Sequence, residues 1–465
     1  MAENVREIVL DILLTLEREE LFSNKLIKAV LDKYDYLSMQ EKSFIKRVAE
    51  GTIERQLELD YYLDACSKVP VKKMKPLIRC LLRMSVYQIL YMDGVPDSAV
   101  CNEACKLAGK RKFINLKGFV NGVLRNIAAK KNHLPLPDKS TQTALYLSIK
   151  YSTPEWLVTM WLSLYGCDMT ERILEGLLLE KPVSLRFSTA LTQEERDRAL
   201  EDIKAHGADL RQSEYLPYVY LAKNTEAVNS LPGFAEGRFM VQDVSSALAV
   251  EAAGIQRKDF VVDVCAAPGG KSLLAAQKAG RVLARDVREN KCALIEENVK
   301  RMQADNVTVQ VFDATVLDES LIEQADVLLL DVPCSGLGVM GKKQDIKYHA
   351  EKESLKELVA LQRQIVEACW QYVKPGGTLL YSTCTINPSE NEDMVKWILE
   401  TFPFEPGQID AYIPRKLREE TEEIQRLLIS LGKAVDRQAA DCSVQLLPGF
   451  MCSDGFFFAR LTRKQ

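Results

Sequence analysis

Two cysteines each come directly after an apolar run that is typical of a β-strand. Cys334 lies in "LLLDVPCSGLG", and Cys384 lies fifty residues later in "GTLLYSTCTINPSENED". A cysteine at a strand is usually a small buried hydrophobe. Cys384 differs because Pro388 and Glu390 predict a helix that begins within a few residues of it, and the positive end of a helix favours the thiolate. The pattern therefore predicts a reactive thiol at Cys384.

An activated thiol next to a carboxyl group suits the methylation of a pyrimidine. Cys334 follows Pro333 in a predicted tight turn, and Asp331 comes just before it on the same strand. Cytosine C5 becomes nucleophilic when a thiolate adds to C6, and an acid at N3 assists that addition. C5 can then take a methyl group, and elimination restores the ring. Asp331 is the candidate acid for this chemistry.

The glycine turn in "VCAAPGGKSLLAA" predicts a binding site for a cofactor without phosphates. Such a turn ahead of a helix brings backbone N–H groups toward a ligand. Its "GGKS" resembles the end of a phosphate-binding loop, but Cys265 occupies the position of that loop's first glycine. The turn also contains Ala266, Ala267 and Pro268, so it approaches a ligand less closely than a pyrophosphate cradle does. S-adenosylmethionine fits such a turn.

Acidic residues follow the next strands. Asp286 ends the run "GRVLARD", where an acid can accept hydrogen bonds from ribose hydroxyls. Asp313, which ends "NVTVQVFD", is placed to lie beside an adenine. The alternative for each acid is that it caps the following helix. Together with Asp331, these acids after a glycine turn favour a nucleoside pocket.

The elements that must position these residues begin after Gly237. Short Val- and Leu-rich runs alternate there with helical stretches such as "KCALIEENVKRMQ" and "KELVALQRQIVEACWQYV". Continuous apolar strands separated by helices predict a parallel sheet covered on both faces, a doubly wound α/β domain. Ligands of such sheets bind beyond the carboxyl ends of the strands. The candidate residues fall at or near these ends: Asp263, Asp286, Asp313, Asp331, Cys334 and Cys384.

The chain of 465 residues is too long for one ordinary core and predicts several domains. Residues 1–135 carry helical periodicity, as in "VREIVLDILLTLE", and predict a helical domain that ends at a linker, "NHLPLPDKSTQ". Residues 136–235 combine a strand-like "KPVSLRFST" with a helical "TQEERDRALEDIKAHG" and predict a small α/β connector. Residues 236–465 are the predicted sheet domain.

Charge is unevenly distributed along the chain. The net charge is −4, yet residues 68–131 hold fourteen Lys or Arg against three acids. This asymmetry is typical of a phosphate-binding face, and its alternative is a solvated helix surface. The charged N-terminus predicts neither a signal peptide nor a membrane span, which favours the cytosol and reduced thiols. With three histidines and no zinc-binding spacing, the sequence predicts no metal site.

These motifs resemble those of a known family. "DVCAAPGGKS", "DVPCSGLGV" and "YSTCT" are similar to the signatures of the Sun/NOL/NOP family of RNA (cytosine-5)-methyltransferases, and "GRFMVQDVSSALA" is similar to the family's segment ahead of the glycine loop. The helices that contain "DSAVCNEACKLAGK" and "FVNGVLRN" resemble a NusB-like RNA-binding domain. The combination is similar to RsmB-type enzymes of small-subunit ribosomal RNA. It implies a multidomain protein, with an all-α NusB-like N-terminal domain followed by an α/β Rossmann-like class I methyltransferase domain.

The resemblance implies a role for each candidate residue. Cys384 adds to C6, Cys334 helps to release the methylated base, and Asp331 faces both cofactor and base. In DNA cytosine methyltransferases the nucleophile belongs instead to a Pro-Cys motif, which makes Cys334 the competing assignment. The residues expected to line the S-adenosylmethionine pocket are Cys265, Ala266, Ala267, Pro268, Gly269, Gly270, Lys271, Asp286, Asp313 and Asp331.

The implied partner is RNA, and the protein is expected to act as a cytoplasmic monomer without a membrane anchor. Ribosomal RNA of the small subunit (16S) is the preferred substrate, and transfer RNA is the nearest alternative. An alternative from another class is an RNA-binding or assembly module whose methyltransferase fold is inactive. The intact cysteine motifs and glycine loop argue against that alternative.

Three segments stand apart from the main pattern. Family members often have two arginines, a proline and a tryptophan where this chain has "GKKQDIKY". Lys342 and Lys343 keep the charge but lack the bidentate geometry of arginine, which weakens the expectation of substrate contacts in this loop. Residues 415–442 predict a solvated helical insertion. Phe456 to Phe458 are expected to be core residues of a closing hairpin, with base stacking as the alternative.

Overall fold

The computed structural model describes residues 4–19, 21–179, 182–225, 228–432 and 437–465. The chain divides into two compact units. The helical unit comprises Met1–Leu174 and Lys342–His349, and the sheet unit comprises Glu175–Gly341 and Ala350–Gln465. The predicted boundaries at residues 135 and 235 fall inside these units, and the three-part division stays a prediction.

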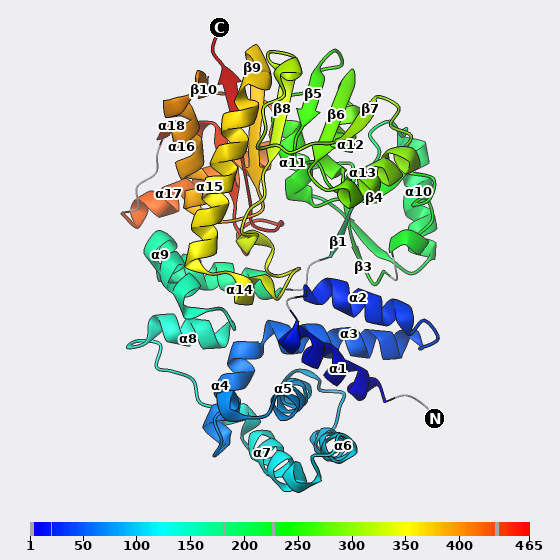
Figure 1. Ribbon diagram of the computed structural model, residues 1–465, viewed down its shortest axis with the longest axis vertical. Helices are drawn as coiled ribbons and strands as arrows, with labels where there is room; N and C mark the ends of the chain where they lie inside the picture. Colours follow the sequence, from blue (N-terminus) through cyan, green and yellow to red (C-terminus); the bar gives the residue numbers. More distant parts are fainter. Residues whose placement is uncertain (1–3, 20, 180–181, 226–227, 433–436) are drawn as a thin grey trace. The chain divides into compact units, whose positions relative to one another are not determined.

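Helices build the helical unit, as the periodicity of its sequence predicts (Figure 1). Their bounds are α1 (Val5–Arg18), α2 (Ser23–Lys33), α3 (Met39–Glu54), α4 (Gln56–Cys66), α5 (Pro76–Tyr91), α6 (Asp97–Lys110), α7 (Lys117–Lys130), α8 (Thr143–Lys150), α9 (Glu155–Leu178, of which the residues up to Leu174 belong to this unit) and α14 (Ile346–His349). α1 begins after Asn4, whose side chain accepts the Arg6 N–H, and α3 begins with a capping box between Ser38 and Glu41. The apolar faces of α1 to α7 enclose one core.

The segment Lys342–His349 packs into the helical unit although it follows the Cys334 motif in the sequence. Asp345 Oδ2 accepts the backbone N–H of Ser23 at the start of α2, with an O–N distance of 2.6 Å. Lys347 Nζ donates to the carbonyl of Glu54 at 2.7 Å. Residues of "GKKQDIKY" therefore contact the protein's own helices, and contacts of this loop with a substrate stay a prediction.

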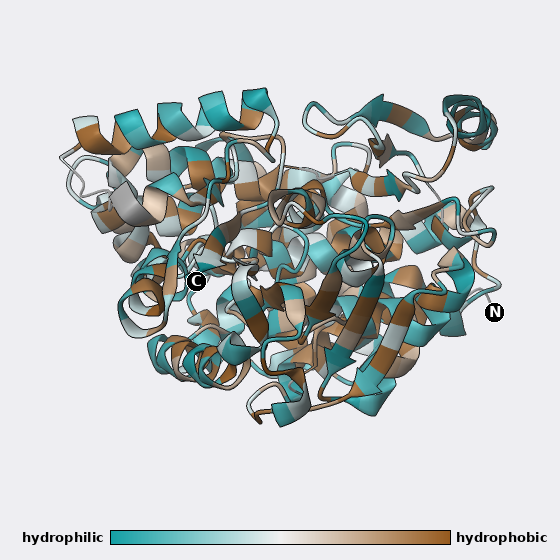
Figure 2. Cartoon of the chain, turned by 90° about the horizontal axis from the view of Figure 1, so that it is seen from above, coloured by the Kyte–Doolittle hydropathy of each residue, from teal (hydrophilic) through white to brown (hydrophobic). Residues whose placement is uncertain are grey.

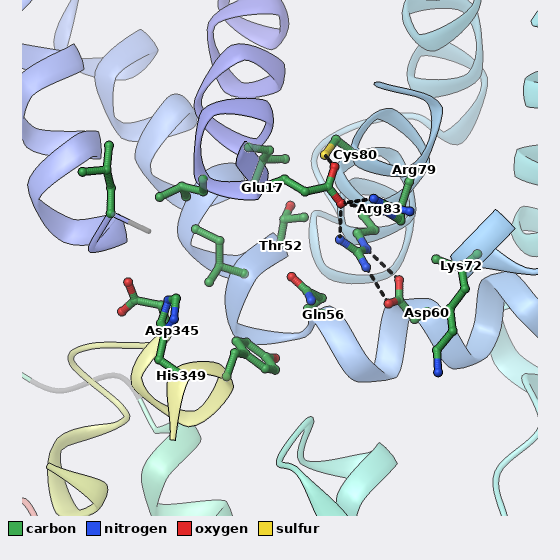
Figure 3. Close-up of a pocket in the computed structure, with 16 residues that line it drawn as sticks. Glu17, Thr52, Gln56, Asp60, Lys72, Arg79, Cys80, Arg83, Asp345 and His349 are labelled. Carbon is green, nitrogen blue, oxygen red and sulfur yellow. Dashed lines mark hydrogen bonds and ion pairs between the residues drawn. The ribbon is translucent and has the colours of Figure 1, made fainter. Parts of the chain in front are cut away.

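The helical unit contains a cavity of about 470 Å³ (Figure 3). Part of its wall is an ion-pair network, in which Glu17 binds Arg79 and Asp60 binds Arg83. The Cys80 thiol donates to the same Glu17 carboxylate. These charges are thus paired with one another.

A small antiparallel sheet occupies residues 183–241 of the sheet unit. Its strands are β1 (Val183–Phe187), β2 (Asp209–Gln212), β3 (Val219–Lys223) and β4 (Phe239–Val241), in the order β2-β3-β1-β4. Helix α10 (Gln193–Ala205) packs on it around a separate apolar cluster. The strand predicted in "KPVSLRFST" and the helix predicted in "TQEERDRALEDIKAHG" are both confirmed.

The main sheet has the parallel core that the alternating pattern predicts. Its strands run in the order β10-β12-β9-β8-β5-β6-β7, with β11 paired to β12. The five strands from β5 to β9 are parallel to one another, and β12 pairs with β9, β10 and β11 in antiparallel fashion. The bounds are β5 (Phe260–Asp263), β6 (Arg281–Asp286), β7 (Val307–Val311), β8 (Ala325–Asp331), β9 (Val373–Thr383), β10 (Phe404–Pro406), β11 (Ser443–Leu446) and β12 (Phe456–Arg463).

Helices cover both faces of this sheet. They are α11 (Val244–Ala252), α12 (Gly270–Ala276), α13 (Glu289–Met302), α15 (Lys352–Cys369) and α16 (Glu392–Thr401). α15 and α16 share one apolar cluster with the strands, and α13 packs in a second cluster with β6 and β7. Figure 2 shows the strands largely hydrophobic and the surrounding helices alternating between polar and apolar residues. Among the residues with described positions, no helix is long and apolar enough to cross a membrane.

The C-terminal part of the chain closes the sheet. The antiparallel pair of β11 and β12 confirms the predicted hairpin. Phe456, Phe457 and Phe458 are at most 4% exposed, which confirms them as core residues. The insertion predicted to be a solvated helix forms α17 (Arg415–Ser430) and α18 (Arg437–Asp441), with Leu417 buried on its inner side. Residues 433–436 of that stretch lie outside the described residues.

Candidate active site

The carboxyl ends of β8 and β9 bring the two cysteine motifs together. In this parallel pair Asp331 lies opposite Ser382, and Ser382 Oγ donates to Asp331 Oδ1 at 2.8 Å. The chain continues to Cys334 after one strand and to Cys384 after the other. The strand order changes direction between β8 and β5, and such a switch point is where ligands of open α/β sheets bind.

The two candidate thiols lie side by side. Cys334 Sγ is 3.2 Å from Cys384 Sγ and also accepts the backbone N–H of Cys384 at 3.2 Å. Both are half-buried, and neither is part of a disulfide within the described residues. Contact with the other thiol, burial and the negative charge of Glu390 raise the pKa of Cys334 well above its usual range. Cys334 therefore keeps its proton at neutral pH and is the thiol that can donate toward the other sulfur.

A buried carboxylate ties the two cysteine loops together. Glu390 is 0% exposed. Its Oε2 accepts hydrogen bonds from Ser335 N–H (2.9 Å) and Gln362 Nε2 (3.0 Å), and its Oε1 accepts from Ser335 Oγ (2.6 Å) and Asn387 Nδ2 (2.9 Å). Ser335 belongs to the first cysteine motif, and Asn387 and Glu390 belong to the second. Glu390 therefore fixes the position of one loop relative to the other.

Replacing Glu390 with glutamine should loosen this arrangement. The new side-chain NH₂ group would face hydrogen-bond donors from which the carboxylate now accepts. A hydrogen bond to a charged group contributes about 1.5–3 kcal/mol to stability. We expect the free energy of unfolding to fall by about 2–3 kcal/mol. We also expect a lower pKa at Cys334, which loses a nearby negative charge, and hence faster alkylation by iodoacetamide at pH 8. Mass spectrometry of Cys334 in a Cys384→Ala background measures that rate.

Glu392→Gln is the matched control for this experiment. Burial raises the pKa of the Glu392 carboxyl to about 7, and its Oε2 has no hydrogen-bond partner in the described part of the chain. Its neutralisation should leave the alkylation rate of Cys334 unchanged. Equal Cys334 reactivity in Glu390→Gln and the parent protein would contradict the role given to Glu390.

Lys271 connects the glycine loop to Asp331. Its Nζ donates to Asp331 Oδ2 at 2.8 Å and to Ser246 Oγ at 2.7 Å, and it lies 5.2 Å from the centre of the Phe456 ring. One oxygen of Asp331 is thus bound by Lys271 and the other by Ser382. The two bonds fix the orientation of the Asp331 carboxylate at the strand end.

The loop Cys265–Lys271 joins β5 to α12. Gly269 has a φ of 101°, a left-handed conformation that glycine adopts without strain. Burial first, and then the charges of Asp263 and Asp331, raise the pKa of the Cys265 thiol well above its usual range. Cys265 is therefore a neutral thiol of the loop and is not suited to act as a nucleophile.

The surroundings of this loop fit S-adenosylmethionine. Gln242 is 5% exposed, and neither polar atom of its amide has a partner among the described residues. A Cβ built on Gly270 would lie 3.4 Å from this amide. Asp286, 4% exposed at the end of β6, accepts from Arg288 N–H, Ala267 N–H and Lys291 Nζ at 3.3, 3.4 and 3.5 Å. An unpaired amide and a weakly bonded carboxylate leave polar groups for the amino acid and ribose parts of that cofactor.

Asp313 differs from Asp286 in its hydrogen bonds. It is exposed, and its Oδ1 accepts from Thr315 N–H at 2.9 Å and from Thr315 Oγ1 at 2.7 Å. The backbone and hydroxyl bonds from Thr315 lower the pKa of Asp313. These bonds close a local turn after β7, and the place of Asp313 beside an adenine stays a prediction.

Three polar residues of the site were not singled out from the sequence. Glu390 was expected only to lie in the first helical turn, and this turn is a 3-10 segment, Pro388–Glu390, ahead of α16. Its partner Ser335 is 55 positions away in the chain. Gln242 and Ser246 lie in "GRFMVQDVSSALA", where polar residues ahead of an apolar helix are the available signal.

Comparisons with known proteins identify the family to which the chain belongs. Residues 251–462 match the family model described as 16S rRNA methyltransferase RsmB/F, and residues 3–129 match the NusB family. The chain is 33% identical to the probable ribosomal RNA small subunit methyltransferase B of Bacillus subtilis (strain 168), over 99% of each chain. It is 29% identical to the ribosomal RNA small subunit methyltransferase B of Proteus mirabilis (strain HI4320), over 92% of each chain.

Solved structures share the fold. The crystal structure of PH0851 matches with a TM-score of 0.78 and 23% identity, over 100% of both chains. The structure of NSun6 from Pyrococcus horikoshii with SFG matches with a TM-score of 0.56 and 20% identity, over 67% of this chain and 98% of that one. At these identities the likeness concerns the fold.

The fold and the site define an S-adenosylmethionine-dependent methyltransferase with a NusB-like helical region. Within this class, the chain belongs to the family of ribosomal RNA small subunit methyltransferase B. The predicted fold class, cofactor and family are thereby confirmed.

Proposed function

We propose that the protein methylates C5 of a cytosine in small-subunit (16S) ribosomal RNA through a covalent bond between Cys384 and C6 of the base. The observation that carries the proposal is the pair of thiols 3.2 Å apart, next to Asp331 at the ends of β8 and β9. Two adjacent thiols suit a reaction in which one bonds to the base and the other assists its release. The names of the relatives support ribosomal RNA over transfer RNA.

Cys384 is the nucleophile in this proposal. Its thiolate forms a bond to C6, and the electron pair of the C5–C6 double bond then becomes available at C5. Cys334 is less suited to this step because the contact with Cys384 and burial keep its proton in place. S-adenosylmethionine supplies the methyl group that C5 takes up.

Asp331 transfers a proton to and from N3 of the base. It takes up the proton that the Cys384 thiol gives up, delivers this proton to N3 as the Cys384–C6 bond forms, and takes it back when that bond breaks. Lys271 and Ser382 hold its two oxygens at 2.8 Å each. The pair orients the carboxyl group toward the base in our proposal, and Lys271 keeps it connected to the glycine loop.

Cys334 assists the release of the methylated base. The electron pair of the C5–H bond restores the ring double bond, the C5 proton passes to water, and the electron pair of the C6–S bond returns to Cys384. The Cys334 thiol lies 3.2 Å from the departing sulfur and can donate its proton to it, and Cys334 then regains a proton from water. A protonated sulfur is the better leaving group, so Cys334 favours turnover.

The proposed function is tested by methyl transfer to defined RNA. The purified protein is incubated with S-adenosylmethionine labelled in its methyl group and with an unmodified 16S transcript or unmodified transfer RNA. We expect labelled 5-methylcytidine after digestion of the 16S transcript, and at least about tenfold less from transfer RNA, a difference of about 1.4 kcal/mol in transition-state binding. Label in another nucleoside would contradict methylation at C5, and label chiefly in transfer RNA would contradict the substrate assignment.

A further inference from the structure

The basic residues of the helical unit fall into two groups. Residues 68–131 contain fourteen Lys or Arg. Six of these are held in ion pairs within the unit: Arg79, Arg83, Lys106, Lys110, Arg111 and Lys131. The other eight form no ion pair within the described residues: Lys68, Lys72, Lys73, Lys75, Lys112, Lys117, Arg125 and Lys130.

The unpaired cations lie on two chain segments that contact each other. Residues 68–75 join α4 to α5, and residues 112–130 contain the approach to α7 and α7 itself. Asn126 Nδ2 of α7 donates to the carbonyl of Cys66, which ends α4 just ahead of residues 68–75, at 2.9 Å, and Lys75 Nζ lies 5.4 Å from the centre of the Phe113 ring. These two contacts hold the segments side by side.

We propose that residues 68–75 and 112–130, the α7 face, bind the phosphate backbone of the RNA substrate. This inference rests on the proposed function and adds the surface on which that substrate docks. Lys and Arg side chains without an acidic partner are the groups that can neutralise the phosphates of an RNA backbone. Asp64, exposed at the edge of this face, accepts the Val71 N–H and is outnumbered by the cations.

Two exposed glycines of α7 support a close approach of the RNA. Gly118 and Gly122 are separated by one helical turn, and a Cβ built on either would meet nothing within 4 Å. Glycine within a helix is unfavourable relative to alanine. No contact among the described residues of the helical unit requires glycine at these positions. A partner backbone that packs directly on the helix between Lys117 and Arg125 accounts for both glycines.

Charge decides the class of partner. A protein helix could also pack on a glycine face, but it would have to supply carboxylates for the cations around it. RNA carries one negatively charged phosphate per nucleotide and so supplies negative groups for these cations along its whole length. The ion-paired wall of the cavity in Figure 3 has no such excess, because Arg79 and Arg83 already bind Glu17 and Asp60. The α7 face is therefore the better phosphate site.

The first test compares two double variants of the full-length protein. Arg125→Gln/Lys130→Gln removes unpaired cations of the α7 face, and Lys106→Gln/Lys110→Gln removes the same charge from the ion-paired cations of α6. Binding of the 16S transcript is measured by filter retention from 50 to 200 mM salt. We expect the slope of log K against log salt to fall by about 1.5 for the first variant, roughly 0.7–0.9 per lost contact, and to change little for the second. Equal slopes for both variants would overturn the inference.

The second test uses the glycines. Gly118→Ala and Gly122→Ala should each raise Tm by about 2–4 °C, because alanine is the better helix former. They should nonetheless weaken binding of the transcript about tenfold, or about 1.4 kcal/mol. Unchanged RNA binding with a raised Tm would overturn the close approach and would point to a protein partner instead.

The methylation assay separates this inference from the proposed function. Arg125→Gln/Lys130→Gln should retain the parent kcat at saturating transcript, since it changes docking and not the thiols, and should raise KM. If the parent protein binds the transcript through the α7 face but forms no 5-methylcytidine, the proposed function fails and the docking face stands. If the parent methylates the transcript and the double variant matches its KM, the docking face fails and the function stands.

Discussion

Cys384→Ala should abolish methyl transfer, with at least about a 10³-fold loss of kcat, because the variant cannot form the bond to C6. Without that bond, C5 of cytosine does not become nucleophilic and cannot take up the methyl group. The variant should still bind the 16S transcript and S-adenosylmethionine, since only one small side chain is removed. Incorporation of labelled methyl groups into the transcript measures kcat, and equilibrium dialysis measures cofactor binding.

The control for this variant is an exposed thiol remote in sequence from both motifs. Cys452 is exposed and free. Cys452→Ala should therefore methylate the transcript at the rate of the parent protein. Undiminished transfer by Cys384→Ala would remove Cys384 from the nucleophile role.

Cys334→Ala should trap the enzyme on its substrate. Cys384 can still add to C6 and C5 can still take a methyl group, but the departing sulfur has lost the proton donor 3.2 Å away. A covalent protein–RNA adduct should accumulate, up to one RNA per chain, and turnover should fall by about 10²–10⁴-fold, the contribution typical of a general acid. A denaturing gel shows the adduct as a band of reduced mobility that disappears on treatment with ribonuclease.

The double variant Cys334→Ala/Cys384→Ala distinguishes the two thiols. It should form no adduct, because no nucleophile is left. If an adduct instead forms with Cys384→Ala and is absent from Cys334→Ala, the roles are reversed, and the Pro-Cys assignment known from DNA cytosine methyltransferases is the correct one.

The sheet and the places of the cysteines follow from local sequence. Runs such as "ADVLLLDVP" and "GGTLLYSTC" are apolar on both sides, which only a sheet covered on both faces accommodates. Strands of a parallel sheet end at the same edge, so Asp331 and Cys384 had to approach each other. The register of β8 and β9 then sets Asp331 opposite Ser382.

Contacts between distant residues could not be predicted in this way. Glu390 shows the reason, because its sequence neighbourhood indicates a helix start, whereas its donors come from Ser335, Gln362 and Asn387. No local pattern reports a bond between residues 55 positions apart. The same holds for the unpaired cations of the α7 face, since a count of charges does not tell which of them the fold pairs with acids.

The insertion of Lys342–His349 into the helical unit affects how the chain folds during synthesis. The N-terminal helices emerge from the ribosome long before residue 349. Until then the backbone N–H of Ser23 lacks its hydrogen bond to Asp345, and the part of the helical core that Tyr348 covers is exposed to solvent. Residues 1–174 produced as a fragment would lack a part of their own unit in the same way. The helical unit is thus completed only after the strands that carry Asp263, Asp286 and Asp331 have been made.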